Sequence, residues 1–289
     1  MEVVQNVRPS PIAGQWYNSD PKRLANQVDN YINDANLPEI TGEVIGVMSP
    51  HAGHRYSGPV AGYAFGMLEG MQPEIVAIIS PMHYPYYEPL LTTAHQAYAT
   101  PLGTIPVDEV ALENLDTGLK KELGFGLEKV ANDTEHSLEI ELPFLQRAIK
   151  SPFTLVPVMV RDQSYFVMER LGLILAHILK DRQTLLVAST DLSHFYPQAI
   201  ANKLDHELLR QVEAFSPAGV IQAEENGKGF ACGRGALASV MVAAKALGAN
   251  QAKILNYATS GDVTGDFSQV VGYGAAVFLK SANPVVSSN

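Results

Sequence analysis

The sequence has little cysteine, no excess of basic residues and no long apolar run, and each absence excludes a class of protein. Only one of the 289 residues is a cysteine, Cys232, so no disulfide can form within the chain. The formal net charge is −10, with 30 acidic and 20 basic side chains. Binding to nucleic acid or to an anionic membrane surface needs a basic patch, so we expect neither partner.

Segments that would enter or cross a membrane are also missing from the sequence. The runs LGLILAHILK and VVGYGAAVFLK each end in a lysine and are shorter than the roughly 20 residues that span a bilayer. The stretch MEVVQNVRPSPIAGQWY lacks the basic region and following apolar region of a signal peptide. We therefore expect a cytoplasmic protein.

Apolar residues make up 46% of the chain, which is enough for a sizeable core. Continuous apolar runs of strand length occur at 43–49, 74–80, 153–160, 184–190, 252–258 and 270–279. Helix-period stretches occur at 21–35, 165–180, 200–215 and 235–247, the first with Asp20 as a predicted N-cap. This alternation predicts an α/β fold in which helices flank a layered, largely parallel or mixed central sheet. No change of composition marks a linker, so we expect a single domain over 1–289 with a flexible tail at 281–289.

A histidine follows three of the predicted strands at a similar place. His51 follows the run at 43–49, His83 follows 74–80, and His194 follows 184–190. The carboxyl ends of parallel strands meet at one crevice, where ligands bind in open α/β sheets. We therefore predict that these three histidines converge on a functional site. For four other histidines, His54, His95, His177 and His206, a structural role is the simpler interpretation.

The only cysteine lies in FACGRGALAS, just before a turn that opens a predicted helix. The helix N-terminus and Arg234 both favour the thiolate of Cys232. A thiolate and two imidazoles form a three-ligand metal set with an open position, as in catalytic zinc sites, and copper or iron also fits. The alternative is a buried cysteine in a turn of small residues, although its glycine neighbours suit close backbone approach at a site.

A further cluster lies in NDTEHSLEIELPFLQ, residues 132–146. If this stretch is helical, Glu135, His136 and Glu139 stand on adjacent turns of one face. Such a cluster is either a second metal site or an acid–base group. The alternative is a solvated helix start that is capped by Asp133 or Thr134.

Taken together, these motifs resemble the MEMO family, the protein B component of the AmmeMemoRadiSam set. The resemblance runs almost from end to end and is closest to the prokaryotic branch. It rests on RPSPIAGQWY, SPHAGHRYSG, ISPMHYP, YATPLGTIPVD, NDTEHSLEIELPFL, VPVMV, STDLSHF, CGRGA and NYATSGDVTGD.

The family in turn resembles class III extradiol ring-cleavage dioxygenases, which are α/β proteins with non-haem Fe(II) held by two histidines and a carboxylate. By motif, the resemblance implies a metal site at His51, His83 and Cys232, with the cysteine where the dioxygenases have glutamate. It implies that His194 is the acid–base histidine and that Asp191 and His136 are catalytic neighbours.

The resemblance also implies a substrate pocket beside the metal. Trp16, Tyr17 and Tyr56 would form an aromatic wall, and Arg234 would anchor an anionic ligand. Ile12 stands where some family members have a histidine, so we expect no catalytic role for that segment. Sulfur is a softer ligand than a carboxylate, which shifts the preference of the site towards copper or zinc, although Fe(II) remains the favoured metal.

The leading hypothesis is a mononuclear, metal-dependent oxidoreductase. Here His194 has a near-neutral pKa that suits acid and base roles, and Asp191 orients a histidine. The substrate would be a small molecule or a modified peptide, with AmmeMemoRadiSam proteins as companions. The alternatives are a non-catalytic ligand- or peptide-binding protein on the same fold and a metal-dependent hydrolase.

Overall fold

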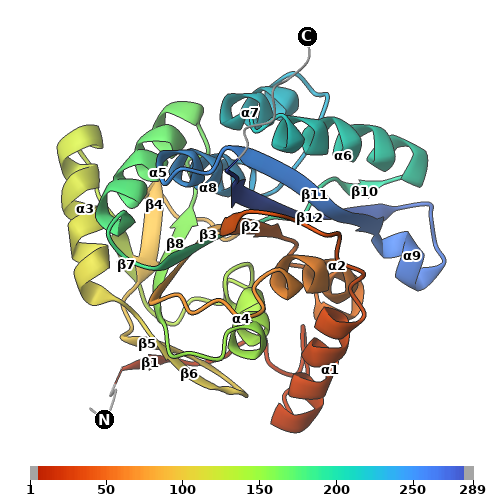
Figure 1. The fold of residues 1–289 in the computed structure, drawn as a ribbon, viewed down its shortest axis with the longest axis horizontal. Helices are drawn as coiled ribbons and strands as arrows, with labels where there is room; N and C mark the ends of the chain where they lie inside the picture. Colours follow the sequence, from red (N-terminus) through yellow and green to blue (C-terminus); the bar gives the residue numbers. More distant parts are fainter. Residues whose placement is uncertain (1–5, 283–289) are drawn as a thin grey trace.

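A nine-stranded mixed sheet forms the centre of the protein, which a computed structural model describes over residues 6–282 (Figure 1). Its middle consists of four parallel strands in the order β2, β9, β3, β8. These strands are β2 (Glu43–Ser49), β3 (Ile75–Pro81), β8 (Thr154–Val160) and β9 (Thr184–Ser189). The predicted α/β fold with a largely parallel, mixed sheet is therefore confirmed.

Antiparallel strands extend this parallel centre at both edges. At one edge β12 (Val270–Lys280) lies antiparallel to β2 and also pairs with β10 (His194–Tyr196) and β11 (Gln251–Thr259). At the other edge β4 (Leu90–Thr93) is antiparallel to β8 and carries β7 (Glu128–Val130). A separate small sheet consists of β1 (Val7–Arg8), β5 (Ala97–Thr100) and β6 (Gly103–Pro106).

Helices cover both faces of the sheet (Figure 1). One side carries α1 (Pro21–Asn33), α2 (His54–Gly66), the 3₁₀ helix η1 (Glu139–Glu141) and α4 (Leu142–Ala148). The other carries α5 (Tyr165–Leu179), α6 (Gln198–Glu213), α7 (Pro217–Glu225) and α8 (Arg234–Ala246). The remaining helices are α3 (Glu109–Leu123), which packs on α5, and α9 (Ser260–Thr264), beside β12.

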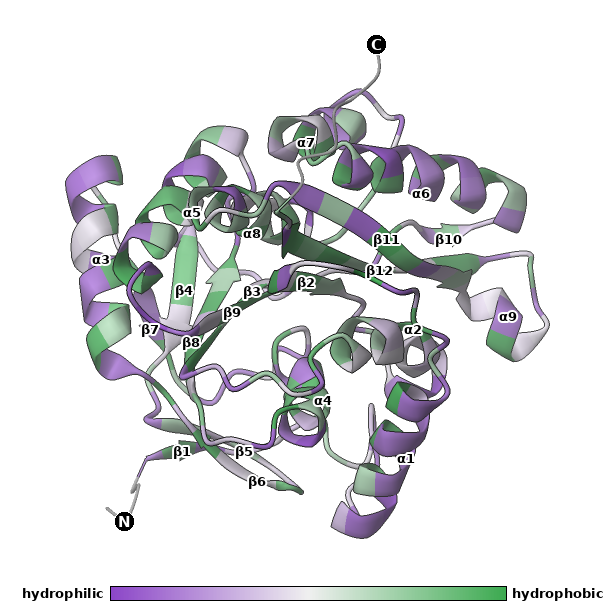
Figure 2. Ribbon diagram, in the orientation of Figure 1, coloured by the Kyte–Doolittle hydropathy of each residue, from purple (hydrophilic) through white to green (hydrophobic). Residues whose placement is uncertain are grey.

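The apolar pattern of the chain explains this layering. The central strands are hydrophobic along most of their length, as Figure 2 shows, and in β3 every residue is buried. The four predicted helices occur as α1, α5, α6 and α8, and the Asp20 side chain caps α1 by accepting a hydrogen bond from the Arg23 amide. No helix within residues 6–282 is long and apolar enough to cross a membrane.

The structure adds α2, which is not among the helices predicted from the sequence. Its glycines and Pro59 weaken the helical signal, but Gly58 and Gly62 lie against Tyr31 of α1. A Cβ atom at Gly62 would lie 2.0 Å from the Tyr31 carbonyl oxygen, so only glycine permits this approach of the two helices. The predicted flexible tail falls, apart from residues 281 and 282, outside the described residues.

A buried arginine ties the N-terminal strand to the segment before η1. Arg8 is 1% exposed, and its guanidinium donates to both carboxylate oxygens of Asp133, at 3.0 and 2.8 Å. It also donates to Glu139 at 2.6 Å and to the carbonyl oxygen of Glu135 at 3.0 Å. The hydroxyl of Tyr17 donates to the same Glu139 carboxylate at 2.7 Å. These contacts fix the course of residues 133–139.

We predict that Arg8→Met lowers the free energy of unfolding by about 3–5 kcal/mol, because Asp133 and Glu139 would remain buried without their cation. Arg147 provides a matched control, since it makes a similar two-bond contact with Asp29 while both side chains are about one-third exposed. Arg147→Met should cost less than about 1 kcal/mol. Urea unfolding measures both free energies. Equal losses of stability in Arg8→Met and Arg147→Met would contradict the view that Arg8 is needed to compensate buried carboxylates.

Candidate metal centre

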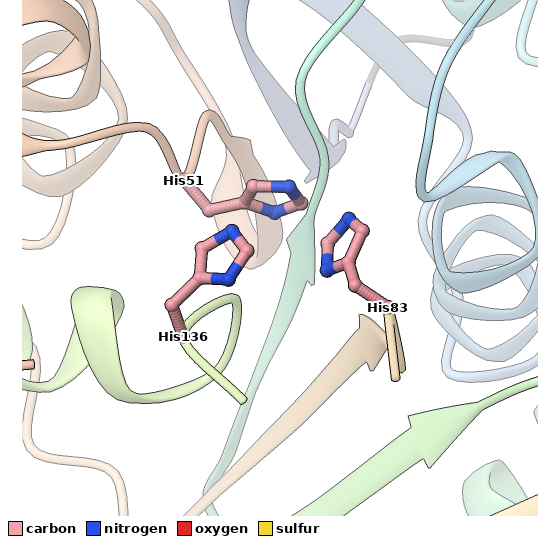
Figure 3. Close-up of side chains that lie close together, drawn as sticks. All are labelled: His51, His83 and His136. Atoms are coloured by element: carbon pink, nitrogen blue, oxygen red, sulfur yellow. The ribbon is translucent and has the colours of Figure 1, made fainter. Parts of the chain in front are cut away.

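Three histidines from separate segments meet beyond the carboxyl ends of the parallel strands (Figure 3). His51 lies two residues past β2, His83 two residues past β3, and His136 in the segment before η1. One ring nitrogen from each lies within 4.8 Å of the others. A metal ion lies about 2.0–2.1 Å from each imidazole nitrogen, so two ligands of one ion are up to roughly 4 Å apart. The group can therefore hold a metal ion after small adjustments.

The hydrogen bonds of His51 leave its second ring nitrogen free to act as a ligand. Its Nδ1 lies 2.8 Å from the hydroxyl oxygen of Ser189, and that hydroxyl donates its own proton to the Ser137 carbonyl oxygen at 2.6 Å. His51 Nδ1 must therefore be the donor, which assigns the neutral tautomer with a lone pair on Nε2. Burial and the neighbouring histidines lower the pKa of His51 well below its usual value, so the ring is neutral.

Glu135 orients the other two histidines. Its carboxylate accepts hydrogen bonds from His83 Nδ1 at 2.9 Å and from the amide of His83 at 2.6 Å, and His136 Nδ1 lies 3.2 Å away. Burial raises its pKa, but the contacts with the two histidines and the Ser137 amide outweigh this and lower it to about 2. A carboxylate on the outer nitrogen fixes the ring and makes the inner nitrogen a stronger ligand.

Cys232 lies beside His51, with its Sγ atom 3.1 Å from His51 Nε2. The turn before α8 approaches β9 closely, because a Cβ atom at Gly233 would lie 2.5 Å from the Ser189 carbonyl oxygen. The expected stabilisation of the thiolate is wrong for the metal-free protein. Burial and nearby Asp191 raise the pKa of the thiol well above its usual value, and Arg234 instead forms an ion pair with Glu224.

His194 lies near the same cluster but outside the group of three close nitrogens. Between the pairs His194–Val271 and Tyr196–Val270, Phe195 is an extra residue with a φ of 61°. This bulge is of the kind that redirects a side chain beside a site. The Nε2 atom of His194 is buried without a hydrogen-bond partner. Burial and His83 lower its pKa to about 4, so the predicted near-neutral pKa is wrong and the neutral ring is a proton acceptor.

Asp191 holds the backbone of the site rather than a histidine ring. Its carboxylate accepts from the His51 amide at 2.8 Å, and its own amide donates to Cys232 Sγ at 3.3 Å. The expectation that Asp191 orients an imidazole is thus corrected, because the ring partner of His51 is Ser189. Burial raises the pKa of Asp191 to about 7.

The segment around His136 also differs from the prediction. Residues 132–138 are not helical, and the helices begin only at η1 and α4. Glu135 therefore faces His83, whereas Glu139 faces Arg8 and Tyr17, and the three predicted neighbours do not share one face.

The four residues predicted to bind substrate separate in the structure. Trp16 stacks on His136, with ring centroids 4.0 Å apart, and Tyr56, near the start of α2, is 38% exposed. Tyr17 is 4% exposed and donates to Glu139, which places it in the core rather than on a pocket wall. Arg234 is engaged by Glu224.

Comparison with known proteins gives the same family over nearly the whole chain. A family model described as Memo-like protein matches residues 8–277. A MEMO1 family protein of Methanopyrus kandleri is 36% identical over 284 residues, which cover 94% of this chain and 99% of that protein. A second, from Nitrosopumilus maritimus, is 34% identical over 277 residues, covering 94% and 100%. This chain belongs to the Memo family.

The Memo match includes every residue of the three-histidine group together with Cys232 and His194. The crystal structure of an uncharacterized protein of Escherichia coli K12 has a similar fold. It aligns with a TM-score of 0.50 at 11% identity and covers 81% of this chain and all of that one. At this identity the likeness concerns the fold alone.

The sequence interpretation missed two residues that position the Memo site, Ser189 and Ser137. Ser189 lies inside the strand predicted at 184–190, so its place was available from the pattern, but its contact with His51 depends on strand pairing. His54, which was set aside as structural, is 1% exposed and its Nε2 contacts the Ile140 carbonyl oxygen at 3.0 Å.

We predict that the metal-free protein loses stability as the pH falls from about 6.5 to 4. Burial lowers the pKa of His54 to about 4, and of His136 and His194 likewise, so the unfolded chain binds more protons in this range. His54 alone should contribute about 2 kcal/mol of this loss between pH 7 and pH 5.

Urea unfolding in EDTA at both pH values tests this. His54→Phe removes one titrating group without touching the candidate ligands, and its loss of stability between the two pH values should be smaller by about that amount. An unchanged pH dependence in His54→Phe would show that the ring is not buried in its neutral form.

Proposed function

We propose that this protein binds one divalent metal ion, with Fe(II) favoured over copper or zinc, and acts as a metal-dependent redox enzyme. The observation that carries the proposal is the convergence of three imidazoles whose donor nitrogens lie within 4.8 Å of one another. The resemblance to extradiol dioxygenases, stated from the sequence motifs, supports the redox assignment.

The residues present fit such an ion. His51 Nε2 carries a lone pair because Nδ1 donates to Ser189, and His83 is held in the same way by Glu135. Cys232 Sγ lies 3.1 Å from His51 Nε2, so both atoms can reach one ion after the thiol loses its proton. We take His51, His83 and Cys232 as the ligands, and His136 as a neighbour that lies close enough to add a fourth.

Bound Fe(II) would supply one-electron chemistry towards dioxygen in a site that keeps open positions. The chain itself would orient the ligands through Glu135 and Ser189 and cover His136 with the ring of Trp16. The unpartnered Nε2 of His194 is a place where a substrate proton can be held. A small molecule or a modified peptide suits this site, and AmmeMemoRadiSam companions are proposed from the resemblance alone.

We predict that protein loaded anaerobically with Fe(II) holds close to one equivalent of metal. His51→Ala and His83→Ala should each reduce the bound metal by about tenfold or more at limiting metal, because removing ligand contacts weakens a site at least as much as removing their supporting partners. Elemental analysis after desalting measures the metal content. His206→Ala is the control, since this histidine lies on α6 and its Nδ1 contacts the Asn202 carbonyl oxygen.

A spectrum of the metal-loaded protein decides whether Cys232 or His136 is the third metal ligand. Co(II) bound by a thiolate gives an intense near-ultraviolet charge-transfer band, and Cys232→Ser should abolish it. If the band is absent from the unaltered protein and His136→Ala removes the metal, the three-histidine set is the real one. Normal metal content in both His51→Ala and His83→Ala would rule out the site itself.

A redox role also predicts that turnover requires dioxygen. An oxygen electrode with the Fe(II)-loaded protein and a panel of catechols and aminophenols should record uptake, and His194→Gln should lower kcat by roughly 10²-fold with the metal retained. Turnover of an ester or amide panel under anaerobic conditions would instead favour the hydrolase. Ligand capture that survives loss of all three metal positions would favour the binding protein.

A further inference from the structure

A buried carboxyl group on α6 contacts the chain one residue before His194. Asp205 is 0% exposed, and its Oδ1 atom accepts a hydrogen bond from the Ser193 amide at 2.8 Å. Its Oδ2 atom accepts from the hydroxyl of Tyr257 at 2.8 Å. Burying a carboxyl group opposes folding unless its partners compensate, and here both hydrogen-bond partners are neutral. The chemistry proposed above gives this residue no role.

Gly272 of β12 makes room for the Asp205 carboxyl group. A Cβ atom at Gly272 would lie 2.0 Å from Asp205 Oδ2, so a larger residue there would displace the carboxyl group. The same glycine pairs with the chain before His194. Its amide donates to the Ser193 carbonyl oxygen at 2.9 Å, and its carbonyl oxygen accepts from the Leu192 amide at 2.9 Å. The amide of Ser193 is thus held by α6 and its carbonyl group by β12.

These contacts lie where the chain redirects the His194 side chain. Phe195, the extra residue in the pairing of β10 with β12, has a φ of 61°. A bulge bends its strand, so the direction of the His194 side chain depends on how the residues before it are fixed. The Nε2 atom of His194 has no hydrogen-bond partner, and the ring packs beside Phe230 with centroids 5.4 Å apart. The backbone and this packing, rather than a hydrogen bond at Nε2, therefore place the ring.

We propose that Asp205 is a positioning residue for His194. By holding the Ser193 amide, it fixes the backbone from which the imidazole reaches the site. The proposal rests on the proposed function where it takes His194 as the group that holds a substrate proton. The placement of the ring can be measured without metal or substrate. Asp205 acts through Ser193 and is not itself a catalytic residue.

Two variants of similar size separate the hydrogen bond from the rest of the side chain. Asp205→Asn keeps an oxygen that accepts from the Ser193 amide. Its nitrogen can donate to the Tyr257 oxygen, because the Tyr257 proton has a second acceptor in Asn202 Oδ1 at 3.0 Å. Asp205→Leu has no acceptor, so it leaves the Ser193 amide buried and unpaired.

The first readout is the nuclear Overhauser effects between the ring protons of His194 and Phe230 in metal-free protein. We expect them in the unaltered protein and in Asp205→Asn, and we expect Asp205→Leu to lose them. A merely structural aspartate would lower the melting temperature in Asp205→Leu and leave these signals unchanged. That result would overturn the proposal.

Tyr257→Phe is the matched control. It removes a hydrogen bond to the other oxygen of the same carboxyl group and leaves the contact with Ser193 in place. It should lower the melting temperature and keep the signals between the His194 and Phe230 rings. Loss of these signals in Tyr257→Phe as well as in Asp205→Leu would show that the ring responds to any damage in this region, which would also overturn the proposal.

Asp205→Ser keeps the test decisive if Asp205→Leu does not fold. Its side chain is one bond shorter, which withdraws the acceptor from the Ser193 amide without adding an apolar group beside it. It should also lose the signals between the two rings. Unchanged signals in Asp205→Ser would overturn the proposal.

The second readout is dioxygen uptake by the Fe(II)-loaded protein with the catechol and aminophenol panel. A ring displaced by about 1 Å should lower kcat of Asp205→Leu roughly 10²-fold while KM changes little, and Asp205→Asn should restore kcat. An unchanged kcat in Asp205→Leu would contradict the positioning role. If the unaltered protein takes up no dioxygen with any compound while Asp205→Leu still loses the signals between the rings, the proposed function falls and the positioning role stands.

Discussion

The hydrogen bonds of residues 133–141 are the constraint on which the candidate site depends. This short stretch carries His136, and it supplies the Glu135 carboxylate to His83 and the Ser137 carbonyl oxygen to Ser189. It has little regular structure of its own before η1, so it cannot hold this shape alone. Arg8, reaching across from β1, fixes it by binding Asp133 and Glu139 inside the protein.

The buried acids in and around this stretch have pKa values shifted in opposite directions, because they differ in how many N–H groups they accept. Glu135 accepts several N–H groups, which stabilise its charge and hold its pKa near 2 despite burial. Glu141 and Asp191 have fewer such donors, so burial prevails and their pKa values rise to about 8 and about 7. The histidines they surround are neutral because burial opposes their charge as well. Neutral imidazoles are the form that binds metal.

Strand pairing explains why His51 and Cys232, distant in sequence, lie together. β9 lies between β2 and β3 and is parallel to both, so the loops that follow these three strands all begin at the carboxyl ends of the strands, side by side. Gly233 lets the turn before α8 pack against the end of β9, which brings the thiol to within 3.1 Å of His51 Nε2. Asp191 follows β9 at the same end of the sheet. Its carboxylate accepts from the His51 amide and its own amide donates to Cys232 Sγ, so it joins the His51 loop to the cysteine turn.

The sequence by itself determined the α/β layering, the four main helices and the strand ends at which His51 and His83 stand, because continuous apolar runs and 3.6-residue periodicity are local signals. It also indicated the family through its motifs. Only the tertiary structure decided that α2 is a helix, since its glycines are explained by the approach to Tyr31 in α1. It also decided which side chains face the site: Tyr17 lies in the core, Asp191 binds backbone, and His136 joins His51 and His83. These outcomes depend on strand register and on contacts between residues far apart in sequence, such as Arg8 with Glu139, which no local pattern encodes.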